Sequence, residues 1–486
     1  MSVFSDKLSA FMKEKGMTTY ALAKYCGMDR SNVYKIVEGT RPLHSENKVK
    51  KIANVLALSP YECKELLQAW RITEVGEYIF FERKLIQDFI CHLNANPNLL
   101  LPKQNKEMSA DNREDIYNNM LLKGKNNLYV FIKHIIEKEV LVENPSIDLI
   151  CQPENSFLYN LLALYGNERG NVTVRHLICL ESLTVEKENK YNLKGLDVLT
   201  PLLMSSCCYQ VYYYYDKVQS HFYNLNILPY MILTQQDALL VSSDFEYGFS
   251  IHNKEQIQLF KQMFEEYISN DNIQELFKDV LHVQELISTY SDLSENTITA
   301  VLSSGPMSAA VPFQIIEKYV RPEKRKEMES FCNKTIDYVN CCIEQQNYKN
   351  FFTEDGVRDF MENSHIVDLM ADDIEDFNKE DRLYVLEQMI WLLKNKEVDG
   401  YMIRPGMINM QRDFYMTVYK KGCINILYKN SNACWRLLAI NEKSLGISFY
   451  NFMEHLSESD YVYDRNGTLE RMEALLKEYR DRFGKI

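Results

Sequence analysis

Hydrophobic positions near the start of the chain recur three and four residues apart, which is the spacing of an amphipathic helix. The pattern predicts a first helix over residues 4–15 that ends near Gly16. One face of this helix carries the apolar side chains Phe4, Leu8, Phe11 and Met12.

Two shorter helical patterns follow the first one. Thr18 and Asp29 each precede an apolar-periodic stretch and are residue types that cap helix N-termini, so helices are predicted to begin at both. Gly27 lies between the two patterns, where a tight turn requires positive φ. The inward positions are Leu22 and Ala23, then Val33 and Ile36. Two short helices joined by a glycine-containing turn form the helix-turn-helix plan.

A longer helix is predicted over residues 72–94, and the polar stretch 94–114, which contains Pro97 and Pro102, is predicted to be a linker. The helix either packs onto the rest of the chain or serves as a dimerising or signalling element. The pattern leaves both interpretations open.

Beyond residue 115 the helical and strand patterns alternate, which favours layered α/β or α+β architecture. Strands are predicted at 147–151, 172–180, 210–215, 229–234, 238–242, 249–251, 401–403, 414–419, 424–428 and 437–440. Helices are predicted at 155–165, 196–206, 254–269, 273–289, 324–346, 381–394, 448–456 and 468–483.

Length and composition support several folded domains. The chain has 486 residues, of which 46% are hydrophobic and 25% charged, a globular composition. We expect a multidomain protein with an all-α five-helix head followed by a large α/β (α+β) body. The expected segments are the helix-turn-helix head at 1–71, the connecting helix and linker at 72–114, an α/β domain at 115–290, and a helical then α+β domain at 291–486.

The sequence also favours a cytoplasmic location. No stretch approaches the roughly 18 uncharged apolar residues of a membrane span, and the N-terminus has no basic region followed by an apolar core. The twelve cysteines form no Cys-x-x-Cys pair, which is typical of buried thiols in a reducing compartment. Redox sensing stays an open alternative.

The net charge of −13 is divided unequally along the chain. Residues 1–71 hold nine Lys and three Arg against seven acidic residues, a net charge of +5, so the remainder carries −18. A phosphate backbone would repel such a body, which leaves the head as the surface suited to nucleic acid.

Residues 4–67 resemble the Cro/repressor-type (XRE-like) helix-turn-helix family. The resemblance lies in the small Ala23, in Gly27 of the turn, in the apolar Val33 and Ile36, and in Gly39-Thr40-Arg41 after the second short helix. A fourth helix over Lys50 to Leu56 and a fifth starting at Ser59-Pro60 also agree with the family. One departure is Thr19, where the family often carries Gln.

The resemblance implies that the helix over residues 29–37 lies in the major groove of DNA. Arg30 and Lys35 suit guanine and Asn32 suits adenine, so these three are expected at base edges. Ser31 and Tyr34 would contact base or phosphate. The backbone contacts, which carry no sequence information, would come from Thr18, Thr19 and Arg41.

Residues 230–267 resemble a degenerate phospholipase-D-like effector module. His252-Asn253-Lys254 begins the His-x-Lys-x-x-x-x-Asp pattern of the enzymes, but Leu259 stands at the Asp position. No metal-ligand spacing, phosphate loop or serine-hydrolase motif is present in the sequence, so no metal, cofactor or enzymatic activity is expected. The hairpin beginning Tyr415-Met416 echoes the one at Tyr230-Met231, which suggests an internal duplication.

We therefore expect a DNA-binding transcriptional regulator. Its partners would be double-stranded DNA with a palindromic operator, a second copy in a homodimer, and a small-molecule or peptide effector bound by the body. One alternative is an antitoxin- or phage-related DNA-binding protein whose body binds a protein partner. Another is an enzyme with a DNA-targeting head.

Overall fold

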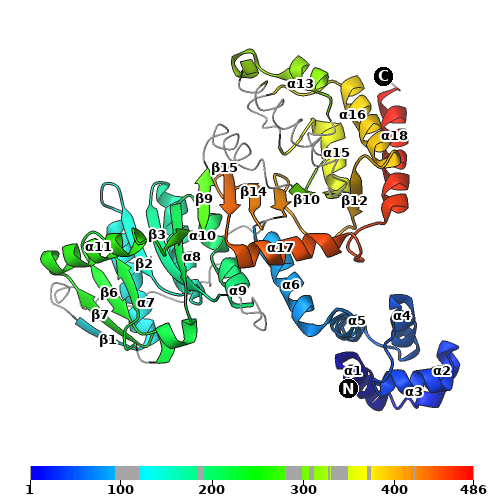
Figure 1. Cartoon of the computed structure of the whole chain (residues 1–486), viewed down its shortest axis with the longest axis horizontal. Coiled ribbons are helices and arrows are strands. Elements are labelled where there is room, and N and C mark those ends of the chain that lie inside the picture. Colours follow the sequence, from blue (N-terminus) through cyan, green and yellow to red (C-terminus); the bar gives the residue numbers. More distant parts are fainter. Residues whose placement is uncertain are drawn as a thin grey trace. The chain divides into compact units, whose positions relative to one another are not determined.

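The computed structural model describes residues 2–93, 120–182, 190–224, 226–280, 298–305, 311–326, 329, 349–368, 374–420 and 422–484. The chain forms two compact units, Met1–Leu85 and Ile86–Ile486 (Figure 1). The linker predicted over 94–114 lies outside the described residues. Within those residues, no helix is both long and apolar enough to span a bilayer.

The first unit is all-helical, as predicted. Residues such as Leu8, Leu22 and Leu66 are fully buried in one apolar core. Gly76, at φ 88°, separates the last two helices, so the helix predicted over 72–94 begins only after it. The helices are α1 (Val3–Glu14), α2 (Thr19–Cys26), α3 (Arg30–Val37), α4 (Glu46–Val55), α5 (Pro60–Val75) and α6 (Glu77–His92), the last of which continues into the second unit.

The second unit begins with an eight-stranded mixed sheet in the order β1-β7-β6-β5-β2-β3-β4-β8. Its strands are β1 (Met120–Lys123), β2 (Ser146–Ile150), β3 (Thr173–Leu180), β4 (Cys208–Tyr215), β5 (Tyr230–Leu233), β6 (Ala238–Val241), β7 (Tyr247–Ile251) and β8 (Gln274–Glu275). Its helices are α7 (Lys125–Glu139), α8 (Ser156–Arg169), α9 (Lys190–Val198), α10 (Thr200–Leu203) and α11 (Lys254–Ile268), with a π-helical turn at Gln219–Asn224.

Helices cover both faces of this sheet. Leu177 of β3 packs in one cluster with Phe264 of α11. The preceding residue, His176, contacts Tyr159 of α8. Because successive strand residues point to opposite faces, α8 and α11 lie on opposite sides, and the sheet is the middle of three layers.

A second, seven-stranded mixed sheet follows in the order β12-β11-β10-β13-β14-β15-β9. Its strands are β9 (Phe277–Val280), β10 (Ile298–Ser303), β11 (Lys349–Thr353), β12 (Asp399–Ile403), β13 (Tyr415–Tyr419), β14 (Ile424–Lys429) and β15 (Trp435–Ile440). The helices are α13 (Phe313–Tyr319), α15 (Glu354–Asn363), α16 (Lys379–Lys394), α17 (Lys443–Leu456) and α18 (Arg465–Phe483), with a 3-10 turn at Pro322–Lys324.

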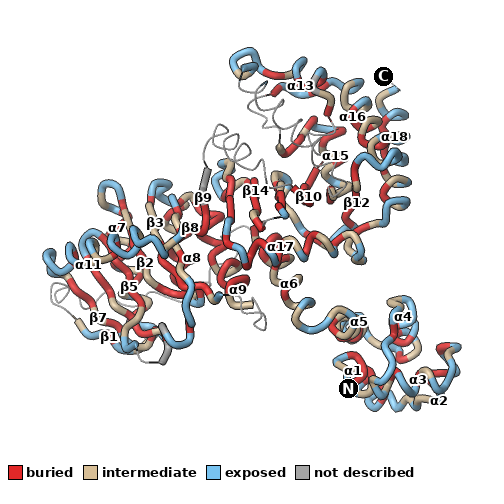
Figure 2. Tube along the Cα trace, in the orientation of Figure 1, coloured by how far each residue is buried: buried red, intermediate tan, exposed pale blue. Residues whose placement is uncertain are grey.

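One apolar cluster joins this second sheet to α13, α15, α16 and α18. Figure 2 shows the strands of both sheets as largely buried. Helix α18 contributes Met472, Leu475 and Tyr479 to the cluster, each at most 2% exposed. Apolar burial therefore holds the C-terminal helix in place.

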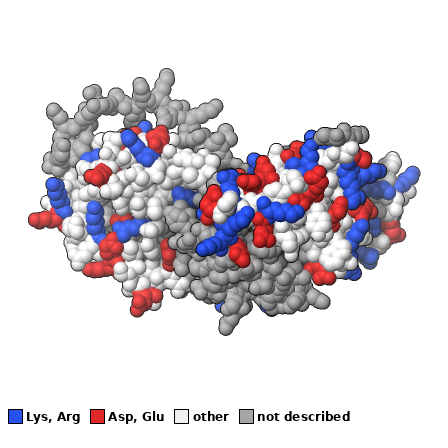
Figure 3. Space-filling view, turned by 90° about the horizontal axis from the view of Figure 1, so that it is seen from above, with Lys and Arg blue, Asp and Glu red and all other residues white. Residues whose placement is uncertain are grey.

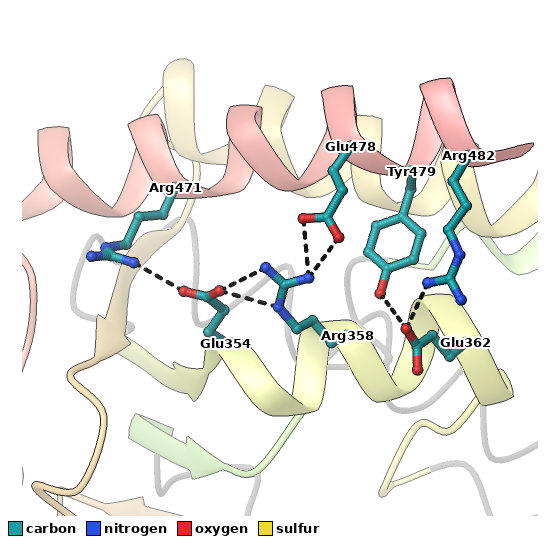
Figure 4. A network of polar contacts seen from close by, with 7 residues as sticks. All are labelled: Glu354, Arg358, Glu362, Arg471, Glu478, Tyr479 and Arg482. Atoms are coloured by element: carbon teal, nitrogen blue, oxygen red, sulfur yellow. Dashed lines mark hydrogen bonds and ion pairs between the residues drawn. The ribbon is translucent and has the colours of Figure 1, made fainter.

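Polar contacts between α15 and α18 line the edge of that packing (Figure 4). Arg358 contacts Glu354 at 3.0 Å and Glu478 at 2.9 Å, while Glu362 accepts from Tyr479 at 3.1 Å and Arg482 at 2.8 Å. Since these ion pairs of α15 and α18 are partly exposed, each adds little to stability. Acidic and basic side chains also lie interspersed on the face of the molecule drawn in Figure 3.

The two sheets share one topology. Strands β2-β3-β4 and β10-β11-β12 are parallel, and each set is followed by an antiparallel meander, β5-β6-β7 or β13-β14-β15. The strand that precedes each set, β1 or β9, pairs with the last strand of the meander. The suggested duplication is therefore present in the fold and extends well beyond the two hairpins.

Two predicted helices of the body differ from the structure. Within the helix predicted over 273–289, residues 274–275 and 277–280 form strands β8 and β9, because they pair with β4 and β15. The helix predicted over 196–206 is broken between α9 and α10, where Pro201 starts a new turn. Most of the helix predicted over 324–346 lies outside the described residues.

A buried histidine sits beneath α8. His176 has no exposed surface, and its two ring nitrogens lie 2.9 Å from the Tyr209 hydroxyl and 2.9 Å from the Cys151 carbonyl oxygen. Burial lowers the pKa of His176 from its usual 6.5 to about 4, because the charged imidazolium is poorly solvated there.

We expect this histidine to make the body acid-sensitive. The unfolded chain binds a proton at His176 near pH 6.5 and the folded chain only near pH 4, so the stability that the neutral ring contributes is lost as pH falls across that window. The full loss is about 3 kcal/mol. Urea unfolding between pH 7 and pH 4 should show a shallower pH slope for His176→Gln than for the exposed-site control His134→Gln. Equal slopes would contradict the assignment.

Candidate nucleic-acid interface

Local hydrogen bonds explain why α2 and α3 begin and end where they do. The Thr18 hydroxyl accepts from the Ala21 amide at 3.2 Å, and the Asp29 carboxylate accepts from the Asn32 amide at 3.0 Å. Gly27 ends α2 in the left-handed conformation at φ 60°. The predicted caps and turn are confirmed, and they set the angle between the two helices.

Helix α3 is attached to the head by few side chains. Its only buried residues are Val33 and Ile36. They enter the core formed with α1, α2, α4 and α5. The other residues of this eight-residue helix are exposed or half-buried, so its outer face is available to a partner.

The structure gathers the predicted DNA-contacting side chains around that outer face. Those on or beside α3 are Arg30, Ser31, Asn32, Tyr34, Lys35 and Arg41, and those at the start of α2 are Thr18 and Thr19. Asn32 and Thr19 are half-buried and the other six are exposed. Their contacts with DNA stay a prediction.

Two contacts organise this surface. The Arg41 guanidinium donates from Nη1 to the Asn32 side-chain oxygen at 2.5 Å. The Arg30 guanidinium lies over the Tyr20 ring, 5.6 Å from its centroid. Sequence reasoning missed Tyr20, which is 60% exposed and takes no part in the apolar core.

A further cation approaches the turn between α2 and α3. The Lys51 amine of α4 lies 3.8 Å from where a side chain at Gly27 would begin. Lys51 is exposed, and the sequence pattern predicted only that it belongs to the fourth helix, without a role in DNA binding. Together with Arg30, Lys35 and Arg41 it makes this side of the head suited to an anionic backbone.

The residues that match the phospholipase-D-like pattern lie directly after β7 of the body's first sheet and in the helix that follows it. His252 follows β7, and its Nδ1 lies 2.6 Å from Asp237, with 9% of the side chain exposed. Ala238 pairs with Ile251 in the first sheet as Ile424 pairs with Ile440 in the second, so Asn441 stands at the position equivalent to His252. Leu259, at the position where the enzymes need Asp, is 56% exposed on α11.

The body also holds a polar cavity of about 430 Å³, lined by Glu362, Asn363, Ser364, Asp376, Arg382 and Arg412. Arg412 is committed to Asp359, at 2.6 and 3.0 Å, and Glu362 to Arg482. In the part of the chain that the structure describes, no group of three or more His, Cys, Asp or Glu residues could hold a metal ion.

Comparison with known proteins agrees with the helical geometry of the head. Residues 7–63 match the family model of the Cro/C1-type HTH DNA-binding domain. No curated protein matches the chain. The Cro/repressor-type resemblance is therefore confirmed over residues 7–63, which form a Cro/C1-type helix-turn-helix domain.

Among solved structures, the chain is similar to a phosphatidylserine synthase of Haemophilus influenzae Rd KW20. The likeness has a TM-score of 0.24 and 9% sequence identity, and it covers 75% of this chain and 93% of that one. At this TM-score the likeness carries no argument about either fold or chemistry.

The end of α3 provides a test of the head's packing. Gly39 has φ 69°, and a Cβ there would lie 2.7 Å from the Ser5 hydroxyl oxygen and 3.1 Å from the Ser2 amide nitrogen. Gly39→Ala should therefore cost at least about 2 kcal/mol, from backbone strain and from displacing the start of α1.

Gly16→Ala is the matched control. Gly16 has φ 62°, with nothing within 4 Å of its Cβ position, so only the backbone cost of about 1 kcal/mol applies. Urea-dependent hydrogen exchange of peptides from residues 2–75 measures both variants. Equal destabilisation by the two substitutions would show that Gly39 is not packed against α1.

Proposed function

We propose that this chain is a sequence-specific DNA-binding transcriptional regulator in which the head reads an operator and the body dimerises and senses an effector. The observation that carries the proposal is the outer face of α3, which is lined with donor side chains, while Val33 and Ile36 are the buried residues that anchor the helix on its inner face. The proposal places the protein in the cytoplasm, where such a regulator meets DNA.

The head would bind with α3 in the major groove. Arg30 and Lys35 would donate to guanine, and the Asn32 amide would pair with adenine. Thr18 and Thr19 would fix the backbone. The +5 charge of residues 1–71 against −18 in the remainder supports the head as the contact surface.

A single head of this size makes few base contacts, so useful discrimination calls for two heads on a two-fold site. The body would hold the two copies together, and the operator would be palindromic. The strands of the body's two sheets are largely buried, which would give the dimer a rigid base.

Helix α6 supports a coupling role for the body. It runs without interruption from Glu77 to His92, and its last residues belong to the second unit. Phe89 packs edge-on against Phe449, with centroids 6.0 Å apart, and His92 lies 2.6 Å from Asp197. A hydrogen bond to Asp197 raises the pKa of His92, so the pair is charged over a wider pH range.

The effector would be a small molecule or peptide. The polar cavity of about 430 Å³ beside α15 and α16 is large enough for a small polar ligand. We propose no phosphodiester cleavage, since Leu259 stands where the phospholipase-D pattern requires Asp and Asn441 stands at the position equivalent to His252.

Selection of duplexes from a random library by the full chain tests the proposal. We expect an inverted repeat to be enriched and its complex to weaken steeply with salt. On the selected duplex, Arg30→Ala should cost about 1–3 kcal/mol of binding free energy and relax the preference at one base. Lys35→Ala should also weaken the complex.

Lys13→Ala on α1 removes a cation outside α2 and α3 and serves as the control, with unchanged discrimination. Failure to enrich any sequence, or full binding by both Arg30→Ala and Lys35→Ala, would contradict the proposed function. Stoichiometric co-purification of a protein would instead favour a body that binds a protein partner.

A further inference from the structure

Two side chains from outside α3 contact two of the predicted base-contacting side chains of α3. Tyr20 comes from α2 and has its ring under the Arg30 guanidinium, at 5.6 Å. Arg41 comes from the segment after α3 and donates to the Asn32 oxygen at 2.5 Å. The two contacts therefore fix Arg30 and Asn32, both in the first turn of α3, from chain segments that precede and follow the helix.

We propose that Tyr20 and Arg41 are positioning residues that set the sequence discrimination of the head. They would do so by orienting Arg30 and Asn32 before DNA arrives. This inference rests on the proposed function, and it assigns to Arg41 a role different from the phosphate contact implied by the family resemblance.

The Tyr20 ring suits this role because it leaves the N–H donors of the Arg30 guanidinium free to bind a base. A guanidinium lying over an aromatic face keeps its N–H donors in its own plane, where they can reach guanine O6 and N7. Arg30 is exposed and would otherwise sample many rotamers. Tyr20 is 60% exposed and does not belong to the apolar core of the head, so core packing does not explain an aromatic ring at this position.

The Arg41 contact determines how the Asn32 amide points. A guanidinium only donates, so the amide oxygen must face Arg41 and the NH₂ group must face away. The oxygen keeps a second lone pair, so one acceptor and two donors stay available for the bidentate pairing with adenine. Arg41 is itself held near α3, since its backbone amide donates to the Lys35 carbonyl at 3.2 Å.

Substitutions at Tyr20 test the first contact on the duplex selected by the full chain. Tyr20→Leu should lower affinity about threefold. The loss should appear as weaker preference for guanine at one position, with an unchanged salt slope. Tyr20→Phe keeps the ring and should restore the discrimination. Tyr25→Leu removes another exposed tyrosine of α2, 65% exposed, and should leave it unchanged.

A double-mutant cycle shows whether Tyr20 acts through Arg30. In an Arg30→Ala background, Tyr20→Leu should have no further effect, because the side chain that it positions is gone. The same threefold loss in both backgrounds, or equal weakening on all sequences, would overturn the role of Tyr20.

Arg41 is tested by separating charge from geometry. Arg41→Lys keeps the positive charge but loses the planar fork, so it should retain the salt slope and lose the preference for adenine. A phosphate contact predicts the opposite: Arg41→Ala would reduce the salt slope by about one and weaken all duplexes equally. That second result would overturn the positioning role.

The same experiments separate this inference from the function on which it rests. If the wild-type chain enriches no sequence, both fail. If it selects a sequence and the Tyr20 and Arg41 variants keep full discrimination, only the positioning role fails. Far-ultraviolet circular dichroism and thermal unfolding of each variant check that the head stays folded.

Discussion

The attachment of α3 by two buried side chains is the constraint on which the head depends. Eight residues are too few for a helix to be stable in water by itself. Burial of Val33 and Ile36 contributes roughly 1.5–3 kcal/mol each, and the Asp29 cap adds about 1 kcal/mol. Because so little of the helix is needed for anchoring, its remaining side chains are available to contact a partner.

The body follows a different principle, in which one layered unit is used twice. Three parallel strands, an antiparallel meander and a returning first strand occur in the same order in both sheets. The residues at equivalent positions have diverged, as His252 and Asn441 illustrate. Common topology with different side chains at the strand ends is typical of a scaffold that keeps its packing while its surfaces change.

Much of the fold could be predicted from hydrophobic periodicity. The caps at Thr18 and Asp29, most strands of both sheets and helices such as α16 and α18 follow from local pattern and turn chemistry. Residues 274–280 could not be predicted in this way. Their sequence favours a helix, but hydrogen bonds to β4 and β15, which are remote in sequence, decide their conformation.

The candidate interface could be predicted only in part for the same reason. The residue types on α3 identify its outer face, because spacing alone separates inward from outward positions. The contacts of Arg30 with Tyr20 and of Asn32 with Arg41 depend on the crossing of α2 and α3 and on the path after Gly39. Neither distance is encoded in local periodicity.

Contact between the outer face of α3 and DNA can be measured by hydrogen–deuterium exchange of the full chain, free and bound to a selected duplex. We expect the strongest added protection in peptides covering residues 18–41, with smaller changes elsewhere in the head. Protection confined to peptides of the body, with residues 18–41 exchanging as in the free chain, would contradict it.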